Sequence, residues 1–199
     1  MQVFKSKIDS GSPDFLKNVE LNQQLLATLK AHMEKSQFQG KSRHIEKARS
    51  KGKLLARERI ELLLDQDAFF LELLPLIGLE GDGFGPGGTA VCGIGLVCGK
   101  LCLINANVGT NRGGSIDKAT LDKSIRISEI AMENALPVIN LVESSGANLP
   151  EQEQIFNYGG IIFREISRRS KKGIPTISCL LYTSPSPRDA TLSRMPSSA

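Results

Sequence analysis

Apolar residues recur at helical spacing in the first third of the chain. Between residues 16 and 34 they fall near one face of a helix, and a second helical pattern runs from 45 to 64, with Gly52 as its weak point. The apolar positions of the first helix are Val19, Leu26, Leu29 and Met33. We therefore predict two helices before residue 66.

The spacing of apolar residues changes after a glycine-rich loop at 81–88. The segments 89–97 and 101–107 are short and rich in β-branched and apolar residues, which predicts two strands. The residues between them, 98–100, are few enough to form the turn of a β-hairpin.

The second half of the chain alternates between helices and buried strands. We predict helices at 121–135 and 151–172, with strands at 138–142 and 174–178 after them. Pro137 ends the first of these helices and Gly173 caps the second. The inward face of the first helix is predicted to comprise Leu121, Ile125, Ser128, Met132 and Ala135. This alternation indicates an α/β domain, in which ligands bind at the carboxyl ends of strands.

Composition and charge exclude several classes of function. The net charge is +4, there is no tryptophan, and the basic run at 41–59 contains acidic residues at helical spacing, so we predict no nucleic-acid partner. No apolar run reaches the roughly 18 residues of a membrane span. The first 17 residues lack the features of a secretory or transit peptide, which favours the cytoplasm, or the mitochondrial matrix in a eukaryote. The four cysteines form no C-x-x-C pair, so we predict no metal site and a reducing compartment.

Two loops carry the candidate chemistry. In the first, 107–115, Arg112 stands beside the paired glycines Gly113 and Gly114, which allow a ligand to approach the backbone. The second, 143–150, joins a buried strand to a helix, so that successive N–H groups can point at one anion or oxyanion. From the residues alone, an ordinary turn and an ordinary helix cap explain these two loops equally well.

Four segments, taken in order, resemble one family. Leu141–Pro150 is similar to the D-S-G-G-A-N-L-P loop of the β (carboxyltransferase) subunits of biotin-dependent acyl-CoA carboxylases, most of all the methylcrotonoyl-CoA type. The other matching segments are Lys53–Asp65, the run from Gly93 to Ser115, and Gly173–Pro175. The resemblance covers about residues 41–178, and it implies a crotonase-like fold of ββα units preceded by helices.

The resemblance also implies the roles of individual residues. Ser145 and Gly146 occupy the paired-glycine positions, so their N–H groups are the expected oxyanion donors, while Glu143 replaces the usual Asp. Substrate contacts are expected from Arg112, Gly113, Gly114, Ala147 and Asn148. The implied reaction moves CO2 from carboxybiotin, held on a biotin carboxylase or biotin carrier subunit, to an acyl-CoA through an enolate. No metal is expected in this subunit, and the whole subunit is expected to form a homo-oligomer.

The predicted organisation is a helical segment over 1–66, the first part of a crotonase-like domain over 67–178, and a tail over 179–199. The tail is Ser/Pro-rich and resembles translated adapter sequence, so we expect disorder there. Because the family's second glycine-rich loop is absent from the 199 residues, we expect this chain to be inactive by itself. The alternatives are a crotonase-like hydratase or isomerase, with Glu143, Glu151 or Glu153 as its base, and the carboxyltransferase subunit of a decarboxylase.

Overall fold

The computed structural model describes residues 6–81 and 84–181 and divides the chain into two compact units. The first unit ends at Phe38 and contains the helix α1 (Pro13–Ser36). Ser12 caps this helix, because its hydroxyl accepts the N–H of Phe15 at 3.3 Å. The helix predicted over 16–34 is therefore confirmed and is slightly longer at both ends.

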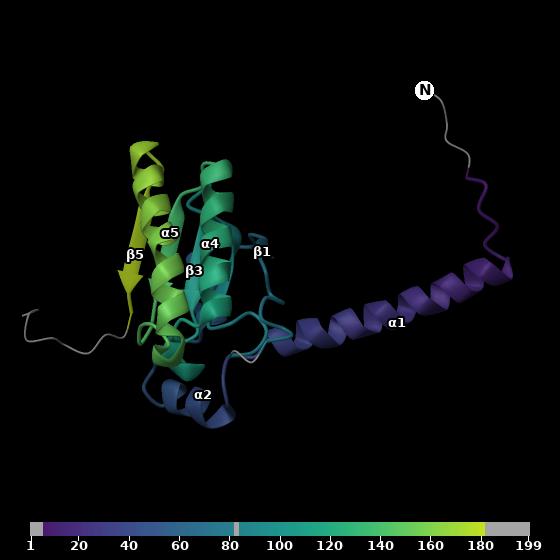
Figure 1. Cartoon of the computed structure of the whole chain (residues 1–199), viewed down its shortest axis with the longest axis horizontal. Helices are drawn as coiled ribbons and strands as arrows, with labels where there is room; N and C mark the ends of the chain where they lie inside the picture. Colours follow the sequence, from purple (N-terminus) through teal and green to yellow (C-terminus); the bar gives the residue numbers. More distant parts are fainter. Residues whose placement is uncertain (1–5, 82–83, 182–199) are drawn as a thin grey trace, which may run out of the picture. The chain divides into compact units, whose positions relative to one another are not determined.

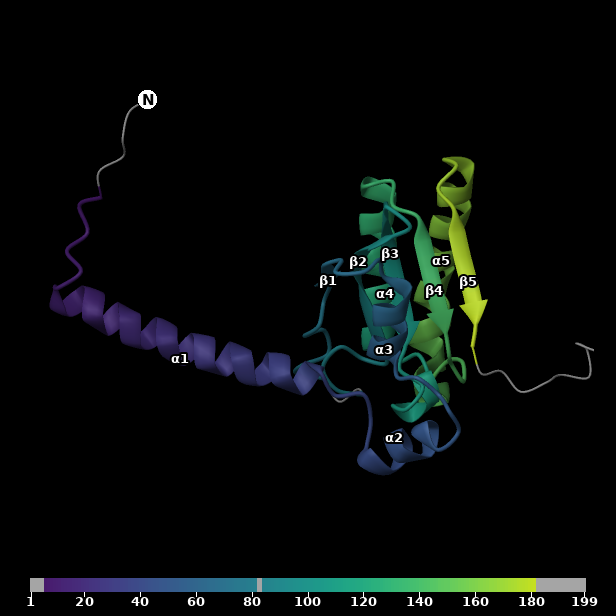
Figure 2. The ribbon, with the colours of Figure 1, turned by 180° about the vertical axis from the view of Figure 1, so that it is seen from behind.

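The second unit begins at Gln39 and is built on a five-stranded sheet in the order β1-β2-β3-β4-β5. Strands β1, β2 and β3 pair antiparallel, whereas β3, β4 and β5 pair parallel. The strands are β1 (Phe70–Glu72), β2 (Ala90–Val97), β3 (Lys100–Asn107), β4 (Val138–Val142) and β5 (Thr176–Leu180). The helices are α2 (Ser42–Arg49), α3 (Ala56–Leu63), α4 (Lys118–Glu133) and α5 (Gln152–Lys171). Figures 1 and 2 show α4 and α5 on one face of the sheet and α3 on the other.

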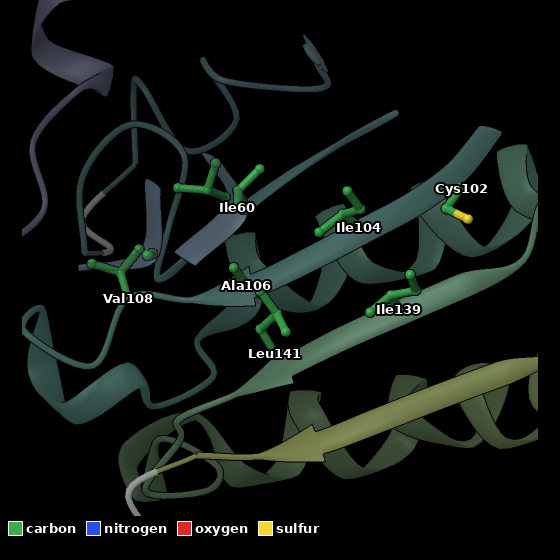
Figure 3. Close-up of a cluster of buried hydrophobic side chains, with 9 residues drawn as sticks. Ile60, Cys102, Ile104, Ala106, Val108, Ile139 and Leu141 are labelled. Atoms are coloured by element: carbon green, nitrogen blue, oxygen red, sulfur yellow. The ribbon is translucent and has the colours of Figure 1, made fainter. Parts of the chain in front are cut away.

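Alternation along the central strands divides the core between the two faces. On β3, Cys102, Ile104 and Ala106 point toward α3, while Leu103 between them packs under α4. Figure 3 shows the cluster on the α3 face, where Ile60 of α3 contributes to the packing. Because both faces are covered, β3 and β4 read as nearly continuous apolar runs, as the sequence predicted.

The predicted hairpin is confirmed, and its turn has only two residues. Cys98 and Gly99 both have positive φ, 50° and 71°, which suits the right-handed twist of the flanking strands. Their N–H groups donate to the two carboxylate oxygens of Asp65, each at 2.7 Å. The end of α3 and the turn are thereby joined, although 33 residues separate them.

The single helix predicted over 45–64 is wrong, because the chain forms α2 and α3 with a turn between them. Gly52 has φ +70°, and the N–H of Lys53 donates back to Ala48, so the first helix ends there. The second helix begins at Ala56, and the N–H of Leu55, the residue before it, donates to the Glu58 carboxylate at 2.8 Å. This bond lowers the pKa of Glu58.

The predicted inward face of α4 is correct only at Leu121 and Ser128. Ile125 and Met132 are half-buried, and Ala135 lies beyond the end of the helix and is exposed. The buried face of α4 also includes Lys123. The Lys123 ammonium donates to the carbonyls of Ala90 at 2.7 Å and Gly87 at 3.3 Å, and burial lowers its pKa. A lysine on the inward face hides the true periodicity from a reading based on apolar residues.

Three further differences concern β1 and the boundaries. The short edge strand β1 was not predicted, because three residues are too few to show an alternation. The predicted boundary after residue 66 differs from that of the structure, in which α2 and α3 belong with the sheet. The predicted boundary at 179 lies inside β5, which runs to Leu180. Residues 182–199, most of the predicted tail, lie outside the described residues.

Candidate active-site loops

The two candidate loops follow neighbouring parallel strands and are joined by main-chain hydrogen bonds. The first loop follows β3 and contains a short 3-10 helix, Arg112–Gly114, while the second follows β4. Ile116 donates to the carbonyl of Gly146 at 2.8 Å, and Asn148 donates to the carbonyl of Ile116 at 2.8 Å. The structure therefore brings together the residues that the sequence assigned to substrate binding, at the carboxyl ends of the strands.

Close contact between the loops accounts for the paired glycines. Gly113 and Gly114 both have φ +67°, and a Cβ on Gly114 would lie 2.1 Å from the carbonyl oxygen of Glu143. A Cβ on Gly113 would lie 3.1 Å from the Ser145 hydroxyl. At Gly114, a side chain is excluded both by the backbone conformation and by the facing loop.

The N–H groups at the tip of the second loop differ in their availability. Ser145, a predicted oxyanion donor, donates its N–H to the Gly113 carbonyl at 3.0 Å. Gly146, the other predicted donor, donates to the exposed hydroxyl of Ser144 at 3.1 Å. In the described part of the chain, no acceptor is found for the N–H of Ala147. The Ser145 donor is thus used to pair the two loops, whereas the Gly146 donor is held only by a local, solvent-exposed bond.

Arg112 places a cation at the edge of the paired loops. Its side chain is exposed, its φ is +51°, and its guanidinium lies 5.4 Å from the centroid of the Phe84 ring. An exposed guanidinium beside glycine-rich backbone suits a phosphate group.

Asn148, by contrast, is used within the protein. Its side-chain amide donates to Glu151 at 3.0 Å, and the other Glu151 carboxylate oxygen accepts the N–H of Lys118 at 2.8 Å. Glu151 therefore joins the second loop to the beginning of α4.

Two of the three acidic residues considered as a general base are engaged within the protein. Glu143 is held by Lys53, at 2.9 Å, and by Arg59, at 3.4 Å. Glu151 accepts two hydrogen bonds, whereas Glu153 lies exposed in the first turn of α5. A hydratase needs a carboxylate free to accept a substrate proton, so these contacts do not favour Glu143 or Glu151 in that role.

Nothing in the sequence indicated that Lys53 and Arg59 bind the Glu143 carboxylate. Both belong to the K-L-L-A-R-E-R-I segment, which was matched to the family without any assigned role. Their spacing carries no sign that they meet Glu143, because the partner lies 90 residues after Lys53.

Within residues 6–81 and 84–181, no three His, Cys, Asp or Glu side chains gather closely enough to hold a metal ion. The helices of the same ranges include none with the length and apolar character required to cross a membrane.

The family of the chain is shown by comparison with known proteins. The carboxyl transferase domain family matches residues 47–186, so the chain belongs to that family. The β subunit of geranyl-CoA carboxylase from P. aeruginosa superposes with a TM-score of 0.80 at 37% identity, over 89% of this chain and 34% of that one. The fold is therefore the crotonase-like α/β fold of carboxyltransferase subunits, as predicted.

Two similar proteins within this family are β subunits of acyl-CoA carboxylases. A probable biotin-dependent acyl-coenzyme A carboxylase β2 subunit of Mycobacterium tuberculosis is 46% identical over 159 residues, covering 80% of this chain and 30% of that protein. A probable mitochondrial methylcrotonoyl-CoA carboxylase β chain of Drosophila melanogaster is 41% identical over 184 residues, covering 90% and 32%. The chain spans about a third of the length of these relatives.

Proposed function

We propose that this sequence belongs to the carboxyltransferase subunit of a biotin-dependent acyl-CoA carboxylase. One observation carries the proposal: the loops after β3 and β4 are paired and present Arg112 and the Gly146 N–H together, in a chain 46% identical to a carboxylase β subunit. The family and the fold support this assignment, and the engaged state of Glu143 and Glu151 favours it over hydration.

In the proposed reaction, the loops bind the thioester and stabilise its enolate. The Gly146 N–H turns from the Ser144 hydroxyl to the thioester oxygen, because negative charge there makes the oxygen the stronger acceptor. Ser145 remains a predicted second donor, provided that its N–H is shared with the Gly113 carbonyl. Arg112 contacts a phosphate of CoA, with Gly113, Gly114, Ala147 and Asn148 shaping the surface beneath it.

Carboxybiotin, carried by a biotin carboxylase or biotin carrier partner, would supply the CO2 and would accept the substrate proton. The new C–C bond forms at the carbon α to the thioester, or at its vinylogous γ carbon. We propose a branched, methylcrotonoyl- or geranyl-like acyl group, since the Asn148-Leu149-Pro150 ending resembles those types and relatives with both names match.

We further propose that the whole subunit is a homo-oligomer located in the cytoplasm, or in the matrix if eukaryotic. The free state of all four cysteines, Cys92, Cys98, Cys102 and Cys179, supports a reducing compartment.

The test is carboxyl transfer by the complete subunit that carries this sequence, combined with its biotin-bearing partner, ATP and labelled bicarbonate. Label is expected in methylcrotonoyl- or geranyl-CoA and not in propionyl-CoA, and Arg112→Gln is expected to raise KM about tenfold at unchanged kcat. Lys172→Gln, which removes an exposed charge at the end of α5, is the matched control. Rapid hydration of crotonyl-CoA without biotin would overturn the proposal.

A further inference from the structure

Glu143, the first residue after β4, lies between two cations from the segment around the beginning of α3. Lys53 Nζ is 2.9 Å from one carboxylate oxygen, and Arg59 Nη2 is 3.4 Å from the other. The side chains are exposed by 27% for Lys53, 19% for Glu143 and only 5% for Arg59. A guanidinium this deeply buried depends on its anionic neighbour.

The same three side chains are tied to the end of β3. Arg59 Nη2 donates to the Asn107 carbonyl at 2.5 Å, and the N–H of Glu143 donates to the Asn107 side chain at 3.3 Å. Gly109 leaves the space that the carboxylate fills, since a Cβ there would lie 2.3 Å from Glu143 Cδ. The Glu143 cluster, defined as Lys53, Arg59, Asn107, Gly109 and Glu143, therefore joins the origins of both loops.

We propose that Lys53 and Arg59 are positioning residues that hold the paired loops in register through the Glu143 carboxylate. None of the three side chains needs to touch substrate in this role. The Glu143 carbonyl contacts Gly114, and the Ser145 N–H and Gly146 carbonyl bind the first loop. Rotation of Glu143 would thus move the Gly146 N–H relative to Arg112. The role of this positioning in catalysis rests on the proposed function, whereas the positioning of the loops by the Glu143 cluster does not.

The test is amide hydrogen exchange, measured by NMR on the 199-residue chain at a concentration at which sedimentation shows it to be monomeric. Glu143→Gln keeps the shape of the side chain and removes its charge. We expect exchange of the loop-pairing amides of Ser145, Ile116 and Asn148 to accelerate about tenfold or more, while the strand amide of Leu103 is unchanged. Glu46→Gln, an exposed acid on α2, removes the same charge and is expected to change none of them.

Rescue by a conservative variant separates positioning from general destabilisation. Lys53→Gln removes one of the two charges that hold the Glu143 carboxylate, so it is expected to accelerate exchange of the same loop amides. Lys53→Arg keeps the charge at that position and should leave the loop amides near wild-type exchange. Unchanged exchange in Glu143→Gln, equal acceleration throughout the sheet, or a Lys53→Arg variant as loose as Lys53→Gln would each overturn the proposal.

The assay contains no acyl-CoA and no biotin. Failure of carboxyl transfer therefore leaves the positioning proposal intact, and a failed rescue leaves the proposed reaction intact.

Discussion

Gly114 illustrates how one residue decides whether the two loops can meet. Its missing side chain leaves room for the Glu143 carbonyl, and its φ of +67° turns the chain toward Ser115. A substitution at Gly114 would therefore be destabilising for two reasons, the positive φ and the collision with the facing loop. At Gly99 only the first reason applies, because φ is +71° and no atom lies within 4 Å of an added Cβ.

We expect Gly114→Ala to lower the free energy of unfolding by about 3 kcal/mol, since it adds a backbone collision to the left-handed strain. Gly99→Ala should cost only about 1 kcal/mol, the strain alone. Denaturant unfolding of both variants measures the difference. Equal losses would show that the facing loop yields to the methyl group.

Cys92 provides a second prediction at this scale, concerning pH. Burial raises the pKa of its thiol from 9.0 to about 11, so the folded state favours the neutral form. This contribution is complete below pH 9 and is lost as the pH rises through about 11. Lys123 has the opposite effect on stability. Burial lowers its pKa, so the cost of burying its charge falls as the pH rises and the ammonium loses its proton.

Between about pH 8 and pH 10, wild type should lose about 1 kcal/mol more stability than Cys92→Ala. The comparison is made by urea unfolding with reductant present, and it uses the slope with pH, since the smaller side chain also lowers stability at every pH. Parallel slopes for the two proteins would contradict the assigned pKa.

At the scale of elements, long periodic segments were predictable and short or interrupted ones were not. The helix α1 and the hairpin β2–β3 follow from local spacing, because all the residues that define them are neighbours in sequence. The division between α2 and α3 depends on Gly52 adopting positive φ, and the inward face of α4 includes a lysine. The hairpin turn, although predicted, depends on Asp65 for its N–H partners.

Asp65→Ala should destabilise the second unit by about 2 kcal/mol, because two charge-assisted hydrogen bonds to the turn are lost together. Glu61→Ala, on the exposed side of α3, is the control and should cost less than about 0.5 kcal/mol. Thermal unfolding monitored by circular dichroism compares them. A similar effect of both substitutions would mean that the turn is stable without Asp65.

At the scale of the whole molecule, the described part of the sheet ends in an edge. Strand β5 pairs with β4 on one side, and Ile177 and Leu180 on it are 57% and 69% exposed. In a chain that spans about a third of its relatives' length, this edge offers unpaired backbone groups to another strand.

The 199-residue chain alone is therefore expected to self-associate with increasing concentration. Ile177→Lys should shift association to at least about tenfold higher concentration, because a lysine on an edge strand opposes pairing. Ser170→Lys adds the same charge at the exposed end of α5 and should have no such effect. Sedimentation velocity measures both, and equal association of the two variants would exclude β5 as the contact.

The sequence by itself determined the α/β class, the main elements and the two loops that carry Arg112, Gly113, Gly114, Ser145 and Gly146. Its ordered motifs also indicated the family, because glycine and apolar spacings reflect local backbone requirements. Only the tertiary structure decided which N–H groups remain available and where Glu143 finds its partners. Those outcomes depend on residues that are far apart in sequence and that parallel strands bring to one edge of the sheet, and no local pattern records such contacts.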